Sequence, residues 1–118
     1  MPTILRTVAA ILVAGCASTA SIPTDPPSIS GIITHVSRSP GQMTILIEER
    51  PEQSSGGDKS AVRITPQTQI LLDSPSGATE LAPEQLAAGN RASAWFAGPV
   101  AESYPTQATA RIVVVRPR

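Results

Sequence analysis

Hydrophobic and polar residues alternate along several short stretches of the chain, and this period of two is typical of β-strands buried on one face. Residues 42–49 (QMTILIEE) show the pattern most clearly. The inward-facing side chains predicted there are Met43, Ile45 and Ile47. Residues 28–36 (SISGIITHV) are rich in β-branched side chains, and Gly31 among them predicts a bulge or a close backbone approach. Because residues 37–41 (SRSPG) have turn chemistry, we expect the two strands to form a hairpin.

Further strands are predicted downstream of a polar loop at residues 50–59. They are residues 60–65, 68–72, 91–96 and 109–115. Residues 73–77 predict a turn, and residues 98–105 join the last two strands. The only helical signal lies at residues 81–88. Its signature residues are Pro83 in the first turn, Leu81 and Leu86 on the core side, and Gly89 at the end.

Five or six short strands, with one short helix before the penultimate strand, predict an all-β fold. We expect a small OB-like barrel, with a two-sheet sandwich as the alternative. The predicted domain covers residues 28–118, which is enough chain for one small domain and not for two.

Residues 1–16 have the organisation of a bacterial lipoprotein signal. Arg6 precedes a short apolar run, and Val13-Ala14-Gly15-Cys16 matches the lipoprotein cleavage box. The run is well short of the roughly 20 residues that a membrane-spanning helix needs. We therefore expect residues 1–15 to be removed and Cys16, the chain's single cysteine, to carry the lipid. Two alternatives remain: an ordinary signal peptide cut after Ala20, and an uncleaved helix.

The mature chain is predicted to begin with a tether and to be nearly neutral. Residues 16–27 (CASTASIPTDPP) combine small residues with prolines, which predicts a semi-stiff linker. The full chain has 9 Lys and Arg against 9 Asp and Glu, so loss of Arg6 leaves a net charge of −1. The basic residues are scattered along the sequence. We therefore exclude nucleic acid as a partner, and electrostatic attraction to anionic lipid also lacks support.

No catalytic or metal-binding signature is present. His35 is the only histidine, and a mature domain without a free thiol lacks the three or four ligands of a zinc site. Glu48 and Glu49 are adjacent on a predicted strand, so their side chains point to opposite faces. A weak calcium site at Glu49, Glu52 and Asp58 is opposed by basic neighbours. We expect no catalytic residue, no metal and no cofactor.

The three aromatic residues, Trp95, Phe96 and Tyr104, lie close together in the sequence. On a strand, Phe96 would continue the face of Ala92 and Ala94, and Trp95 would face the other side. One interpretation is that all three aromatics fill the core, with the Tyr104 hydroxyl bonded to backbone in a structural corner. We favour it because so small a domain has few other large residues. The alternative is a binding rim built from Trp95, Glu102, Tyr104 and Gln107.

Trp95-Phe96 is followed by Gly98, by VAESYP at residues 100–105 and by Gln107-Ala108. This arrangement resembles the C-terminal signature of the YobA-like family of small bacterial lipoproteins. The likeness extends less specifically over residues 29–115. It implies a small OB-like barrel and a lipid anchor, and it implies no catalytic residue because the family has no assigned biochemical function.

These features predict a non-enzymatic lipoprotein of the bacterial cell envelope. We expect it outside the cytoplasm, anchored through Cys16 in the outer membrane or the cell membrane. Its expected role is a small binding or accessory module for a small ligand or an envelope protein. The alternative is a structural protein that pairs with an envelope partner through a barrel edge, and an enzyme is the third hypothesis.

Overall fold

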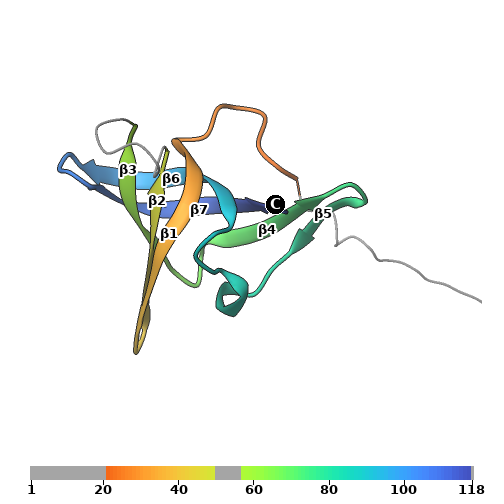
Figure 1. The fold of residues 1–118 in the computed structure, drawn as a ribbon, viewed down its shortest axis with the longest axis horizontal. Coiled ribbons are helices and arrows are strands. Elements are labelled where there is room, and N and C mark those ends of the chain that lie inside the picture. Colours follow the sequence, from red (N-terminus) through yellow and green to blue (C-terminus); the bar gives the residue numbers. More distant parts are fainter. Residues whose placement is uncertain (1–20, 50–56, 118) are drawn as a thin grey trace, which may run out of the picture.

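The computed structural model describes residues 21–49 and 57–117. The described residues form seven strands and one short 3-10 turn, η2 (Figure 1). The elements are β1 (Ile29–Ser39), β2 (Gln42–Glu48), β3 (Lys59–Ile64), β4 (Gln69–Ser74), β5 (Gly77–Glu80), η2 (Pro83–Gln85), β6 (Arg91–Ala101) and β7 (Thr106–Arg116). None of the described helical segments is long and apolar enough to cross a membrane.

Five of the strands close into a barrel. β1, β2 and β3 form an antiparallel meander, β3 then pairs in parallel with β7, β7 pairs antiparallel with β6, and β6 returns to β1. In this order the last strand lies parallel to the third and the penultimate strand pairs with the first, as in an OB barrel. The predicted all-β, OB-like barrel is therefore confirmed. The closed ring rules out the two-sheet sandwich.

β1 belongs to both halves of the barrel. Its first residues, from Ile29 to Ile32, pair with β6, and its remainder pairs with β2. Gly31 lies where the chain crosses from one partner to the other, and a Cβ there would fall well inside van der Waals distance of the Glu48 carbonyl oxygen. The predicted close approach at Gly31 is confirmed, whereas the bulge lies further along, between Ile33 and His35.

The barrel interior is filled by the inward positions of the alternating strands. The fully buried residues include Ile33, Ile45, Ile47, Val62 and Val113. Met43 and Ile64 are also buried, and Arg63 between two buried neighbours is exposed, as the alternation predicts. Phe96 packs against the same core from a half-buried position, so the predicted face of Phe96 is confirmed.

The segment between β3 and β6 departs from the predictions. β4 and β5 form a hairpin through a tight turn at Ser74–Gly77, so the predicted turn is present but β5 was not anticipated. The predicted helix at residues 81–88 is reduced to η2, although Leu86 is buried as expected. The reason is tertiary pairing: backbone hydrogen bonds from Gly89 N to Ile33 O (2.7 Å) and from Ile33 N to Asn90 O (2.9 Å) draw the following residues onto β1.

A second hydrophobic cluster lies on the outer face of the barrel, under residues 21–28, which we call the strap (Figure 1, orange). Its buried members are Leu71, Trp95, Ile112 and Val114. Ile22 packs against them, and the Trp95 indole Nε1 donates a hydrogen bond to the Asp25 carbonyl oxygen (3.0 Å). We predicted a semi-stiff linker over residues 16–27, whereas the described part of it, from residue 21 onward, is docked on the domain through Ile22 and Asp25. Residues 16–20 lie outside the described residues.

Candidate functional site

The outer ends of β6 and β7, residues 97–109, form an extension of the barrel that we call the arm. The two strands run beyond the predicted ends at Phe96 and Thr109, and a short turn joins them at the end of the molecule opposite β5 (Figure 1). Parallel pairing of β7 with β3, from Ser60–Thr106 to Arg63–Thr109, holds the arm against the barrel wall. Gly98 has a φ of 72° within a register irregularity of β6, a conformation that favours glycine and bends the strand.

A groove of about 340 Å³ lies between the arm and the outer face of β2 and β3. This volume is at the lower end of the range of small-ligand sites. The lining residues are Thr44, Ala61, Arg63, Pro99, Val100, Ala101, Gln107, Ala108 and Thr109. Hydroxyl and amide groups thus stand beside small apolar side chains, and Arg63 supplies the one charge in the lining. Such a surface can hydrogen-bond a polar ligand while burying small apolar parts of it.

Tyr104 stands beside the groove on the turn of the arm. It is 71% exposed, and the Lys59 ammonium lies 5.4 Å from the centre of its ring. Lys59 also forms an ion pair with Glu48 (3.7 Å), whose other carboxylate oxygen accepts a hydrogen bond from Thr34 Oγ1 (2.6 Å). Thr34, Glu48 and Lys59 thus hold one another on one side of the Tyr104 ring, which stays exposed to solvent. The cation–π interaction between Lys59 and the ring contributes about 0.5–1 kcal/mol.

The structure brings three of the four predicted rim residues together and separates the fourth. Gln107 lines the groove, and Glu102 and Tyr104 are exposed on the turn that bounds it. Trp95, by contrast, is 4% exposed and lies under the strap, covered by Ile22. The assignment of Trp95 to a rim is therefore wrong.

The structural-corner interpretation of Tyr104 is also wrong. Within residues 21–49 and 57–117, no hydrogen bond joins the Tyr104 hydroxyl or the Glu102 carboxylate to another residue. The turn is closed instead by Ser103, whose hydroxyl donates to Pro105 O (2.7 Å) and whose carbonyl accepts from Thr106 Oγ1 (3.4 Å). Glu102 and Tyr104 are both exposed, Tyr104 to 71%.

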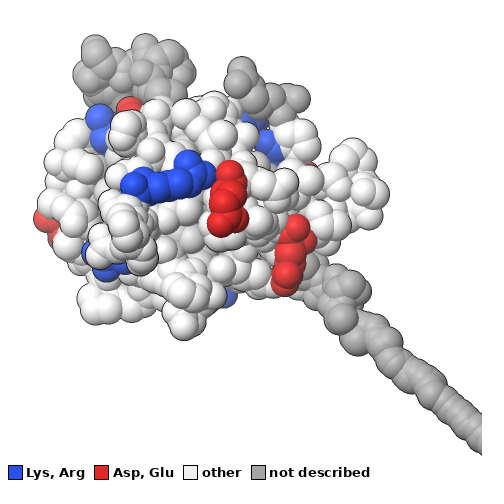
Figure 2. All heavy atoms as spheres, turned by 90° about the horizontal axis from the view of Figure 1, so that it is seen from below, with Lys and Arg blue, Asp and Glu red and all other residues white. Residues whose placement is uncertain are grey.

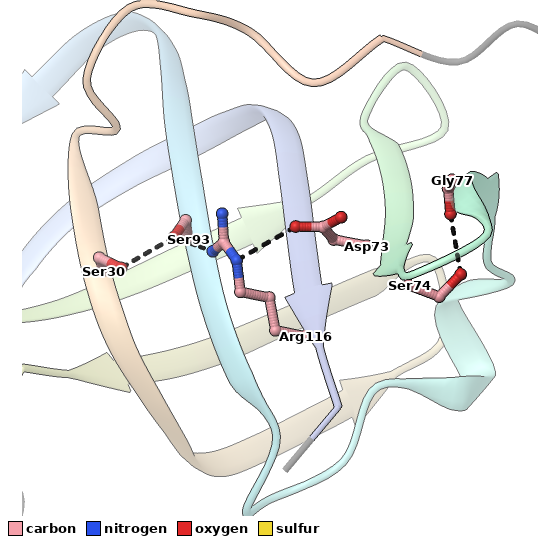
Figure 3. Close-up of polar contacts among 6 residues, drawn as sticks. All are labelled: Ser30, Asp73, Ser74, Gly77, Ser93 and Arg116. Atoms are coloured by element: carbon pink, nitrogen blue, oxygen red, sulfur yellow. Dashed lines mark hydrogen bonds and ion pairs between the residues drawn. The ribbon is translucent and has the colours of Figure 1, made fainter.

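A second polar constellation crosses the outer sheet and is structural. Arg116 forms an ion pair with Asp73 (3.3 Å) and donates from Nη1 to the buried Ser93 hydroxyl (3.0 Å), which also bonds to Ser30 (2.8 Å) (Figure 3). These contacts link β4, β7, β6 and β1. The buried Ser93 hydroxyl therefore has partners on both sides, as buried polar groups generally do.

Other candidate groups are dispersed. His35 is exposed, and the Glu49 carboxylate accepts a hydrogen bond from Asp58 N (3.3 Å) at the base of the β2–β3 loop, while Glu52 lies outside the described residues. In the described parts of the chain, no three side chains of the metal-ligating types lie together. The face seen in Figure 2 carries both basic and acidic residues among uncharged ones, and neither charge forms a patch on it. Cys16 lies outside the described residues.

The groove itself was not predicted from the sequence. Arg63 was assigned correctly to an outer face by its alternation, but its closeness to the arm depends on the parallel β3–β7 pairing. No short-range pattern signals a pairing between strands so distant in sequence. Val100 lies on the arm and is 40% exposed. The only feature of the sequence that could have pointed to its place in the groove is that it is an apolar residue in a joining segment with Gly98 and Pro99.

In comparisons with family models, with curated proteins and with solved structures, the chain matches none. The identification of the fold consequently stands on the strand order. The resemblance to the YobA-like family stays a prediction.

Proposed function

We propose that this chain is a lipid-anchored, non-enzymatic lipoprotein of the bacterial cell envelope that acts as a binding or accessory module. The lipoprotein cleavage box ending at Cys16 supports the anchor. The composition of the same N-terminal segment, together with the C-terminal signature, supports membership of the YobA-like family. The membrane is the outer membrane or the cell membrane.

We further propose that the arm and its groove form the recognition surface. The observation that carries this proposal is the exposure of Glu102, Tyr104 and Gln107, whose side-chain polar atoms have no hydrogen-bond partner among the described residues. A tyrosine suits such a surface, because its ring can pack against apolar groups of a ligand while its hydroxyl forms a hydrogen bond. The ligand is a small molecule or an envelope-protein segment with both apolar and hydrogen-bonding groups.

A second candidate is a structural protein that pairs through a strand edge. The observation in its favour is β5, a four-residue strand that pairs only with β4 within the described chain. Its outer edge is open to a strand from a partner. The outer edge of the arm is less suited to such pairing, because Pro99 has no amide hydrogen to donate.

Photo-cross-linking in intact host cells separates these functions. A photoreactive phenylalanine analogue replaces Tyr104 in one variant and Thr79 of β5 in another. We expect a discrete adduct from position 104 and none from position 79, with the adduct identified by mass spectrometry. An adduct from position 79 alone favours the edge-pairing function, and the absence of any adduct from position 104 contradicts recognition by the arm.

A further inference from the structure

We propose that the strap sets how the anchored barrel stands on the membrane, with the β4–β5 hairpin near the lipid and the arm directed away from it. This inference rests on the lipid anchor of the proposed function. It adds a role for residues 21–28, which a simple linker would not have.

The strap is held to the barrel by contacts of different kinds along its length. At its start, Ile22 packs on the outer cluster that includes Leu71 of β4. In its middle, the Asp25 carbonyl accepts the Trp95 indole hydrogen bond (3.0 Å). At its end, Ser28 N donates to Ala94 O (2.8 Å) and Ser28 Oγ accepts from Phe96 N (3.0 Å). The path of the strap across the sheet is therefore defined from Ile22 onward.

Docking of the strap shortens the free connection to the lipid. Six residues separate Ile22 from Cys16, which allows a reach of at most about 20 Å when fully extended. If the strap were free, the connection would run to Ser28 and reach about 40 Å, enough for the barrel to turn over. The docked strap thus restricts the orientations that the barrel can adopt.

The point at which the connection leaves the barrel is near the β4–β5 hairpin. Ile22 packs against the outer cluster that contains Leu71, and Leu71 pairs with Glu80 of β5. The strap begins beside this hairpin, whereas the arm turn lies at the opposite end (Figure 1). Ala101 lies six positions beyond Trp95 along β6, so up to about 20 Å of strand separates the point where the strap crosses β6 from the start of the arm turn.

The proposed orientation rests on the strap and not on charge. The β4–β5 hairpin carries Asp73 and Glu80 and no basic residue, and it gains no attraction from anionic headgroups. The consequence for recognition is that the groove opens toward the aqueous compartment. Its partner is then a soluble molecule or a protein standing away from the anchoring membrane, not a headgroup of that membrane.

The test is paramagnetic broadening of amide signals on a nanodisc. The isotope-labelled chain from Cys16 onward is coupled through its single thiol to a maleimide-bearing lipid, in a bilayer doped with a gadolinium-chelating lipid. We expect the amides of Ser76 and Gly77 to be broadened severalfold more than those of Ser103 and Thr106, because the two turns lie at opposite ends of the barrel and the effect falls steeply with distance. Equal broadening, or the reverse order, overturns the proposal.

Strap variants test whether the strap is the cause. Ile22→Ser weakens the docking of the strap, and Trp95→Phe removes the indole donor together with part of the ring that packs under the strap. Each variant is expected to reduce the difference between the two ends at least about twofold by lengthening the free connection. Thr24→Ala, at an exposed strap position, is the matched control and leaves the difference unchanged. An unchanged difference in both strap variants overturns the proposal. The lipid is attached chemically in this experiment, so its outcome does not depend on lipidation in cells. Absence of lipidation in cells would contradict the proposed function without affecting the nanodisc measurement.

Discussion

Glu102, Tyr104 and Gln107 are exposed residues in a domain that has few large side chains to leave uncovered. In a chain with one Trp, one Tyr and one Phe, Trp95 and Phe96 contribute to hydrophobic clusters and Tyr104 does not. Its ring is instead supported from one side by Lys59. This division of the aromatic residues points to recognition at Tyr104 more than any motif in the sequence does.

Tyr104→Phe is expected to leave the free energy of unfolding within about 0.5 kcal/mol of wild type, because the hydroxyl has no partner in the described chain. Urea unfolding followed by Trp95 fluorescence measures it. The sequence alone favoured a stability loss through a broken corner bond. A loss above about 1 kcal/mol would restore the corner interpretation.

Gly31→Ala is expected to destabilise the domain by about 1–3 kcal/mol, because the new methyl group would collide with the backbone of β2 near Glu48. Chemical denaturation of purified protein measures the change. Ser37→Ala, at an exposed position of the same strand, is the control and should be nearly neutral. Equal stability of the two variants would show that β1 and β2 do not approach as described.

At the scale of elements, the strap behaves as part of the domain. Removal of residues before Ser28 is expected to lower the free energy of unfolding by about 1–3 kcal/mol, through the lost packing of Ile22 and the lost acceptor of the Trp95 indole. Unfolding of chains that begin at Ala20 and at Ser28 gives the comparison. Identical stability, with an unchanged Trp95 emission maximum, would mean that the strap is a tether after all.

Strands in which hydrophobic residues alternate with polar ones, and which bury one face, were predictable from the sequence. β2 and β3 each bury one face, so Met43, Ile45 and Val62 mark them without tertiary information. β5 escaped prediction because its four residues bury no face, with only Ala78 half-buried. η2 is shorter than predicted because backbone pairing with Ile33 overrides the local helical signal. Local patterns specify elements here, and long-range pairing decides where they end.

At the scale of the whole molecule, the OB-like barrel was predictable and the candidate site only partly so. Gln107, Tyr104 and Glu102 were identified from an unusual segment, yet the groove exists only because β7 returns parallel to β3. Trp95 was misplaced because nothing in the local pattern shows that the strap folds back over it. The residues were therefore visible in the sequence, whereas their assembly depended on contacts far apart in the chain.

The anchor determines where the whole molecule works. Cys16→Ala is expected to abolish incorporation of labelled fatty acid and to release the protein from the membrane fraction, because lipidation requires the thiol. Metabolic labelling followed by fractionation of host cells measures both. Label in the Cys16→Ala variant, or no label in the wild type, would remove the lipoprotein assignment.

Recognition by the arm is the central claim, and the yield of the adduct from the photoreactive residue at position 104 tests it most directly. Gln107→Ala is expected to reduce that yield about tenfold, the effect of losing one or two hydrogen bonds to the partner, while the melting temperature stays unchanged. Gln67→Ala removes the same group from an exposed turn outside the groove and should keep the full yield. A yield that Gln107→Ala leaves intact, or that falls equally with Gln67→Ala, would contradict the account.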